Sequence, residues 1–281
     1  MTLMKIQFAK YQALGNDFLV VESAKPWTRA YASKVVPTMC ARRTGIGADG
    51  VLLVSPSRIA NKRVDVFNAD GGWAEKSGNG LRIAAVHLAR KRKSAQLHLE
   101  MGGQIDEVVI LGKSQKGLNV RADLGKPEFK AVAVPVKSRH AYMVNRPLRV
   151  GKETVQVTCL AVGNPHAVIV VKEFDFDWRK LGAEIEKHRA FPNGTNVEFV
   201  RVLSKSKIRV AEWERGAGAT GSSGTGAAAA VAACVTLGLV NRKCEVQFEP
   251  GSLYINWQEA SGTILLTGPV SHVMSGTIEV K

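Results

Sequence analysis

The chain has 281 residues, of which 45% are hydrophobic and 22% charged, and its formal net charge is +15. This length can bury one large core or two ordinary ones. The basic residues are scattered apart from short runs such as Arg90 to Lys93, and no nucleic-acid-binding motif accompanies them, so we expect a solvated basic surface and no nucleic-acid partner.

No targeting or membrane segment is expected. Residues 1–10 lack the apolar stretch of a signal peptide, and no apolar run has the length of a membrane span. Both observations favour a cytoplasmic protein. The four cysteines, Cys40, Cys159, Cys234 and Cys244, lie far apart and lack the close pairs of a zinc site. We interpret them as buried small hydrophobic residues and expect no metal.

The first half of the chain alternates strand patterns with two helix patterns. Strands are predicted at 5–8 and 18–21, around a turn at 14–17 in which Asn16 is either structural or directed into a site. A helix is predicted at 29–40, then a glycine-rich turn at 42–50. The further elements, in order, are strands at 51–54 and 64–67, a helix from 81, and strands at 97–100, 107–111 and 118–122. Short strands with period-two alternation indicate an antiparallel sheet.

The second half repeats this plan after a boundary predicted near 125–127. The elements expected there are a strand at 155–162, a turn at 163–166, a strand at 167–171, a helix at 178–188, a strand around 208–213 and strands at 253–257, 263–267 and 277–280. In the strand around 208–213, Ile208 and Val210 share one face, and Arg209, Ala211 and Trp213 share the other.

Two glycine-rich loops occupy the same place in the two halves. Ser77-Gly78-Asn79-Gly80 and Ser223-Gly224-Thr225-Gly226 each follow a strand pattern and each open a helix pattern. Glycines let backbone amides approach a ligand closely, and a helix N-terminus presents unpaired N–H groups with a partial positive charge. Two such helix ends could face one carboxylate from opposite sides.

A dinucleotide-binding interpretation fits less well. Residues 216–221 spell G-x-G-x-x-G after a strand, but the helix begins only after a further Ser-Gly-Thr-Gly, and the surrounding strands do not alternate with long helices. Gly112-Lys113-Ser114 is not a phosphate-binding loop either, because the full G-x-x-x-x-G-K-S/T motif needs a glycine at position 107, where this chain has Glu107.

Charged residues beside the second loop suggest an amino-acid ligand. His166 follows Asn164 on the predicted turn, and Glu214 and Arg215 directly precede the glycine-rich loop. A lone histidine is usually structural. Beside two carboxylate seats, however, His166 and Glu214 could hold an ammonium group while Arg215 holds a second carboxylate.

Several motifs resemble those of the diaminopimelate epimerase family, in the order in which that family has them. They cover nearly the whole chain and are found at residues 14–18, 43–50, 67–71, 163–168, 191–197, 214–218 and 267–270.

The resemblance implies an α+β fold of two similar domains, each a curled, mostly antiparallel sheet around a central helix, with the active site in the cleft between them. The domains are expected at 1–126 plus 271–281 and at 127–270, with the last strand returning to the first domain. It also implies a small-molecule amino-acid substrate, no pyridoxal phosphate or other cofactor, no metal, and a homodimer.

The resemblance also implies the site residues. The reacting carboxylate would bind the amides of Gly78, Asn79, Gly224 and Thr225, and the ammonium would bind His166 and Glu214. The far end of the substrate would be held by Asn68, Asn164, Asn196 and Arg215.

Both acid–base positions depart from the family. The family removes and returns the α-proton with two cysteines, whereas this chain has Ser77 and Ser223 there. A thiol titrates near ~8.5 and an alcohol near the ~15.7 of water, a gap of about seven units or ~10 kcal/mol. A serine needs an adjacent base, and Glu75 and Lys76 are the nearest candidates. Ala219, where the family usually has glutamate, is a second departure.

Three hypotheses follow. The chain is an epimerase that interconverts LL- and meso-diaminopimelate, a step toward lysine and peptidoglycan precursors. Alternatively, it is a silent homologue that binds an amino acid without turnover, or a related isomerase with a different base.

Overall fold

The computed structural model describes residues 4–92 and 95–280, and the chain divides into two compact units. Unit 1 comprises 1–123 and 267–281, and unit 2 comprises 124–266. The boundaries predicted from the sequence, after 126 and after 270, lie a few residues further along the chain. The predicted α+β class, two similar domains of strands around a helix, is confirmed.

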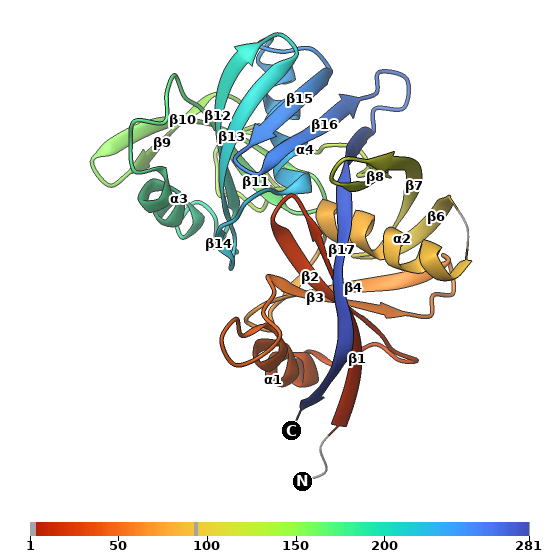
Figure 1. The fold of residues 1–281 in the computed structure, drawn as a ribbon. Helices are drawn as coiled ribbons and strands as arrows, with labels where there is room; N and C mark the ends of the chain where they lie inside the picture. Colours follow the sequence, from red (N-terminus) through yellow and green to blue (C-terminus); the bar gives the residue numbers. More distant parts are fainter. Residues whose placement is uncertain (1–3, 93–94, 281) are drawn as a thin grey trace. The chain divides into compact units, whose positions relative to one another are not determined.

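Unit 1 is a closed ring of strands (Figure 1). In ring order the strands are β1 (Met4–Ala13), β2 (Asn16–Glu22), β3 (Gly50–Ser55), β4 (Lys62–Asn68), β6 (Gln96–Met101), β7 (Gln104–Ser114), β8 (Gly117–Asp123) and β17 (Ile264–Val280), which pairs with both β8 and β1. The pairs β2–β3 and β4–β6 are parallel, and the other pairs with a described register are antiparallel. The short β5 (Trp73–Ala74) pairs with β4.

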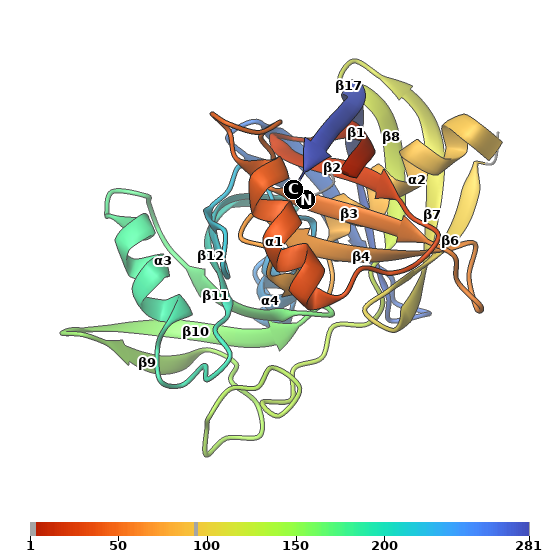
Figure 2. The ribbon, with the colours of Figure 1, turned by 90° about the horizontal axis from the view of Figure 1, so that it is seen from below.

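Two helices complete unit 1 in different ways. Helix α2 (Gly78–Arg92) contacts strands all around the ring, and its residues Leu81, Ile83 and Leu88 are buried. Helix α1 (Arg29–Cys40), predicted at these residues, lies outside and crosses β3 and β4 (Figure 2). Since a sheet covered on both faces is buried, β3 is buried along its whole length.

Unit 2 curls its strands around helix α4 (Gly224–Thr236). In pairing order the strands are β9 (Arg146–Val150), β10 (Glu153–Ala161), β11 (Pro165–Val170), β12 (Asn196–Ser204), β13 (Lys207–Glu214), β15 (Lys243–Phe248) and β16 (Gly251–Trp257). The short β14 (Gly218–Ala219) pairs with β13, and helix α3 (Trp178–Glu186) packs outside on β12 and β13. Residues 224–234 of α4 are all buried, which explains a helix made almost wholly of alanine, glycine and valine.

The two units follow one plan. In each, a parallel pair flanks the outer helix (β2–β3 and β11–β12), an antiparallel hairpin follows (β3–β4 and β12–β13), and the chain then enters the central helix through a glycine-rich loop. The structure therefore shows the repeat that the two loops predicted.

Three expectations about elements were wrong or incomplete. His166 is not in a turn but in β11, because the turn ends at Asn164. The last two predicted strands are one strand, β17, which runs unbroken through Gly268 and Gly276. Strands β9, β12 and β15 were not predicted. The basic run Arg90 to Lys93 meets the end of α2 as expected, although Lys93 lies outside the described residues.

Candidate active site

Both serines cap the central helix of their unit. The amide of Gly80 donates to Oγ of Ser77 at 3.0 Å, and the amide of Gly226 donates to Oγ of Ser223 at 3.2 Å. Serine is among the preferred residues at this position because its oxygen satisfies an amide that the helix cannot. Each hydroxyl therefore already has a structural role.

The backbone amides in the first turn of each central helix have the properties of an anion-binding site. The first amides of a helix have no acceptor within the helix and lie at the positive end of its dipole. Gly80 and Gly226 also lie close to their surroundings: a Cβ on Gly80 would stand 2.9 Å from Leu52, and one on Gly226 would stand 2.6 Å from Glu212. A larger residue at either position would therefore force Leu52 or Glu212 to shift.

In unit 1 the side chains of Asn79 and Asn16, next to the N-terminus of α2, form a hydrogen-bond network. Nδ2 of Asn79 donates to Oδ1 of Asn16 at 3.0 Å, and Nδ2 of Asn16 donates to Asp49 at 3.0 Å. The guanidinium of Arg82 donates to Oδ1 of Asn79 and to the carbonyl oxygens of Gly78 and Pro269. The structure thus places Asn16 and Asn79, both predicted site residues, in one buried cluster.

Arg82, in the first half of α2, adds a buried positive group to this network. Its side chain is fully buried, and burial lowers its pKa to about 9. Among the described residues no carboxylate forms an ion pair with it. At neutral pH the guanidinium is protonated, so it strengthens the attraction of this helix end for an anion.

Asn16 is positioned by a second polar cluster. Asp17 and Asp49 exchange hydrogen bonds with each other's backbone amides at 3.0 Å, and Arg42 bridges both carboxylates. Burial opposes ionisation of Asp17, but the hydrogen bonds and charges of Arg42 and Lys10 hold its pKa below the ordinary value. Burial raises the pKa of Asp49.

In unit 2, predicted site residues form a continuous chain of contacts. Nε2 of His166 lies 2.8 Å from Oδ1 of Asn164, whose Nδ2 donates to Oγ1 of Thr225 at 3.3 Å. Oγ1 of Thr225 lies 3.4 Å from Oγ of Ser223. The other ring nitrogen of His166 lies 2.6 Å from Glu198. Both nitrogens of this fully buried histidine are thus engaged within the unit.

Behind the Ser223 cap lies a group of buried carboxyl groups. Glu198 and Glu212 face each other across β12 and β13, and each is 1% exposed. Burial raises the pKa of Glu198, and burial together with the charges of Glu214 and Glu198 raises the pKa of Glu212 well above its ordinary value. Thr220 contacts both Glu212 and Glu214.

The remaining predicted residues lie at strand ends: Asn196 begins β12, Arg215 directly follows β13, and Asn68 ends β4. Nδ2 of Asn196 donates to the carbonyl of Pro165, and its Oδ1 accepts from the amide of Arg215 at 2.9 Å. Asn196 and Arg215 are therefore brought together. In unit 1, half-buried Asn68 ends β4, and its backbone N–H donates to the carbonyl oxygen of Gly72.

The cysteines are buried and unpaired with one another, as predicted. Burial raises the pKa of Cys40, Cys159 and Cys234 to about 12 and that of Cys244 to about 11, so none supplies a thiolate near neutral pH. In the part of the chain that the structure describes, no group of three or more histidine, cysteine or acidic residues could hold a metal ion. No described helix is both long and apolar enough to cross a membrane.

Sequence reasoning missed Glu198 and Glu212. The period-two pattern that put Ile208 and Val210 on one face also puts Glu212 on that face, and this face meets α4. The signal was present, but a carboxylate in a strand pattern is ordinarily assigned to solvent.

The fold is shared with solved isomerase structures of low sequence identity. It matches a hydroxyproline epimerase from Agrobacterium vitis with a TM-score of 0.74 and 14% identity, over 98% of this chain and 93% of that one. A predicted epimerase from Pseudomonas aeruginosa matches with a TM-score of 0.68 and 14% identity, over 97% and 99% of the two chains. The class is therefore the two-domain α+β fold of such epimerases.

The sequence identifies the family within that class. The diaminopimelate epimerase family model matches residues 8–130 and 158–273. Diaminopimelate epimerase from Caldanaerobacter subterraneus is 36% identical over 280 residues, covering 98% of this chain and all of that protein. The chloroplastic enzyme of Oryza sativa is 37% identical, over 97% of this chain and 80% of that protein. This chain belongs to the diaminopimelate epimerase family.

Proposed function

We propose that this protein is an amino-acid isomerase that interconverts LL- and meso-diaminopimelate by proton transfer without a cofactor. The observation that carries the proposal is 36% identity to an enzyme of that name over 98% of this chain, which includes both capped helices. The same relationship supports a place in the supply of lysine and peptidoglycan precursors, a cytoplasmic location and a homodimer.

The binding roles follow from the two helix ends. The reacting carboxylate would accept from the amides of Gly78, Asn79, Gly224 and Thr225, while Ser77 and Ser223 stand at the two acid–base positions. The remaining assignments are His166 and Glu214 for the ammonium, Asn68, Asn164, Asn196 and Arg215 for the distal end, and Asn16 as support for Asn79. The contacts of Asn16 with Asn79 and of Asn196 with Arg215 support these last two assignments.

A second candidate is a homologue that binds the amino acid without turnover. Both serine hydroxyls serve as helix caps, and both nitrogens of His166 are engaged within the unit. An unassisted alcohol faces a cost of ~10 kcal/mol relative to a thiol in forming the base. These observations favour binding without turnover, unless another group acts as the base that removes the α-proton.

Exchange of the α-proton separates the two candidates. The protein is incubated with LL- or meso-diaminopimelate in deuterium oxide, and deuterium at the α-carbon is followed by proton NMR. An isomerase incorporates deuterium. No exchange, with binding still measurable by calorimetry, would establish the silent homologue.

The double variant Ser77→Cys/Ser223→Cys tests the rest of the site. A gain of exchange would show that only the acid–base pair limits the reaction. If the folded variant neither exchanges nor binds diaminopimelate, the proposed substrate is wrong.

A further inference from the structure

One hydroxyl in unit 2 lies between two carboxyl groups. Oγ1 of Thr220 is 3.1 Å from Oε1 of Glu212 and 2.5 Å from Oε1 of Glu214. A threonine hydroxyl has a single proton to donate, and ionised carboxylates only accept. Both contacts can be full two-centre hydrogen bonds only if one carboxyl group carries a proton and donates it to Thr220.

The surroundings of Glu212 identify it as the carrier. It is 1% exposed, and its Oε2 has no hydrogen-bond partner among the described residues. The titratable groups that shift its pKa are Glu214 on its own strand and Glu198 on β12, which His166 of β11 already contacts. Arg179, Arg209 and Glu249 line the same cavity, but no ion pair among the described residues joins either arginine to Glu212. Helix α4 presents Gly226 there, without a side chain. An ionised carboxylate without a cation in such a place is strongly disfavoured.

We propose that Glu212, Thr220 and Glu214 form a proton relay, in which Glu212 stores a proton that passes to Glu214 when Glu214 is not paired with the substrate ammonium. In the forward step the proton on Oε1 of Glu212 moves to Oγ1 of Thr220 as the hydroxyl proton of Thr220 moves to Oε1 of Glu214. Glu212 becomes the carboxylate, Glu214 becomes the acid, and Thr220 is unchanged. The role of Glu214 at the substrate rests on the proposed function, whereas the stored proton does not.

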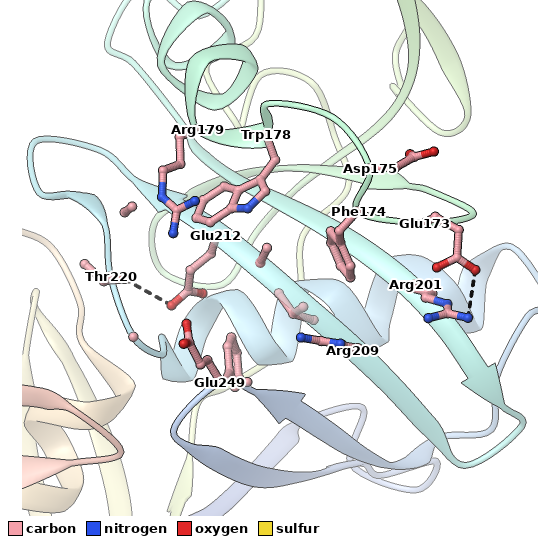
Figure 3. A pocket seen from close by; sticks show the side chains of 15 residues that line it. Glu173, Phe174, Asp175, Trp178, Arg179, Arg201, Arg209, Glu212, Thr220 and Glu249 are labelled. Atoms are coloured by element: carbon pink, nitrogen blue, oxygen red, sulfur yellow. Dashed lines mark hydrogen bonds and ion pairs between the residues drawn. The ribbon is translucent and has the colours of Figure 1, made fainter.

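A cavity gives the relay a route to solvent. It measures about 650 Å³, lies within unit 2, and has both Glu212 and Thr220 in its lining (Figure 3). Its other walls include exposed Glu249 and Arg209, so the cavity is polar and can admit water. Water there can return a proton to Glu212 after Glu214 has given one away.

The relay is confined to unit 2. Val66 and Ala74 precede Ser77 by the same numbers of residues as Glu212 and Thr220 precede Ser223. Leu52 of unit 1 likewise faces Gly80 as Glu198 faces Gly226. Apolar side chains thus replace the acids in the first copy, so the fold itself does not need them.

Infrared spectroscopy tests the stored proton without any substrate. We expect wild-type protein at neutral pH to show the C=O stretch of a buried carboxylic acid, and we expect Glu212→Gln to lose it. Loss in Glu198→Gln with retention in Glu212→Gln would overturn the assignment, as would absence of the band in wild type. Glu212→Val, which copies Val66, provides a second variant if Glu212→Gln does not fold.

Kinetics test the relay through Thr220. Thr220→Val should lower the rate of α-proton exchange by about 100-fold and change its pH profile, whereas Thr220→Ser should keep most of the rate because it keeps the hydroxyl. Thr236→Val, which removes a hydroxyl at the far end of α4, is the matched control. Equal rates in the valine and serine variants of Thr220 would refute the relay.

Failure of the proton relay and failure of the proposed function give different results. Exchange is measured in wild type or, if wild type is silent, in Ser77→Cys/Ser223→Cys. If neither protein exchanges, the proposed function fails, and the infrared band alone decides whether Glu212 holds a proton.

Discussion

Replacing both capping serines, Ser77 and Ser223, with cysteine should destabilise the protein. Each serine oxygen accepts from the amide three residues ahead, at 3.0 Å for Ser77 and 3.2 Å for Ser223. Sulfur is a weak acceptor, so each change to cysteine removes most of a helix cap, which is typically worth ~1 kcal/mol. The double variant should therefore lose about 2 kcal/mol, or roughly 4–8 °C in midpoint at ~2–4 °C per kcal/mol for a domain of this size.

Calorimetry and urea unfolding of wild type, both single variants and the double variant measure this loss. Thr28→Ala is the matched control because Thr28 caps α1 by the same contact, a 3.1 Å bond from the amide of Tyr31, away from the proposed chemistry. It should lose similar stability and leave α-proton exchange unchanged. Unchanged midpoints in both cysteine variants would show that the serine hydroxyls do not stabilise the helices.

Three further outcomes are expected. Lys76→Met should cost about 3–5 kcal/mol, because it leaves Asp106 buried without its 2.6 Å ion pair, and Lys76→Met/Asp106→Leu should recover much of the loss in urea unfolding. Burial raises the pKa of Glu212, so its protonated form stabilises the fold at low pH, and that contribution is lost as pH rises through the raised value. Glu212→Val should thus gain stability over wild type as pH rises from about 5 to 8, and a gain that shrinks with pH would contradict this sign. None of the four cysteines should react with a thiol reagent at about pH 8 before unfolding, since burial raises their pKa values to about 11 or 12.

Local patterns predicted much of this fold. Helix α1 has the predicted bounds, and its buried residues Ala32, Val35, Val36 and Met39 recur with helical period. The two serine-glycine loops indicated the repeat. Strand β12 was missed because its first five residues are all buried, so the sequence there lacks the period-two alternation of a half-buried strand. Pairing partners decide such cases, and they lie far away in the sequence.

The candidate site was predicted less completely, for a related reason. Ser223, Asn164 and His166 were identified, and the structure links them through Thr225. Glu212 was not, because its importance depends on Thr220 and Glu198, which pack against it only in the folded unit. A buried acid in a strand resembles an exposed one until its neighbours are known.

Strand β17 also determines the order in which the two units can form during synthesis. Unit 2 is one uninterrupted segment, 124–266, whereas unit 1 needs residues 267–281 to fill the place between β8 and β1. On the ribosome the first-made half must therefore wait with two unpaired strand edges until the second half has been translated. Unpaired edges invite association with other chains. A nascent chain stalled before residue 267 should consequently be more prone to aggregation than the isolated 124–266 segment.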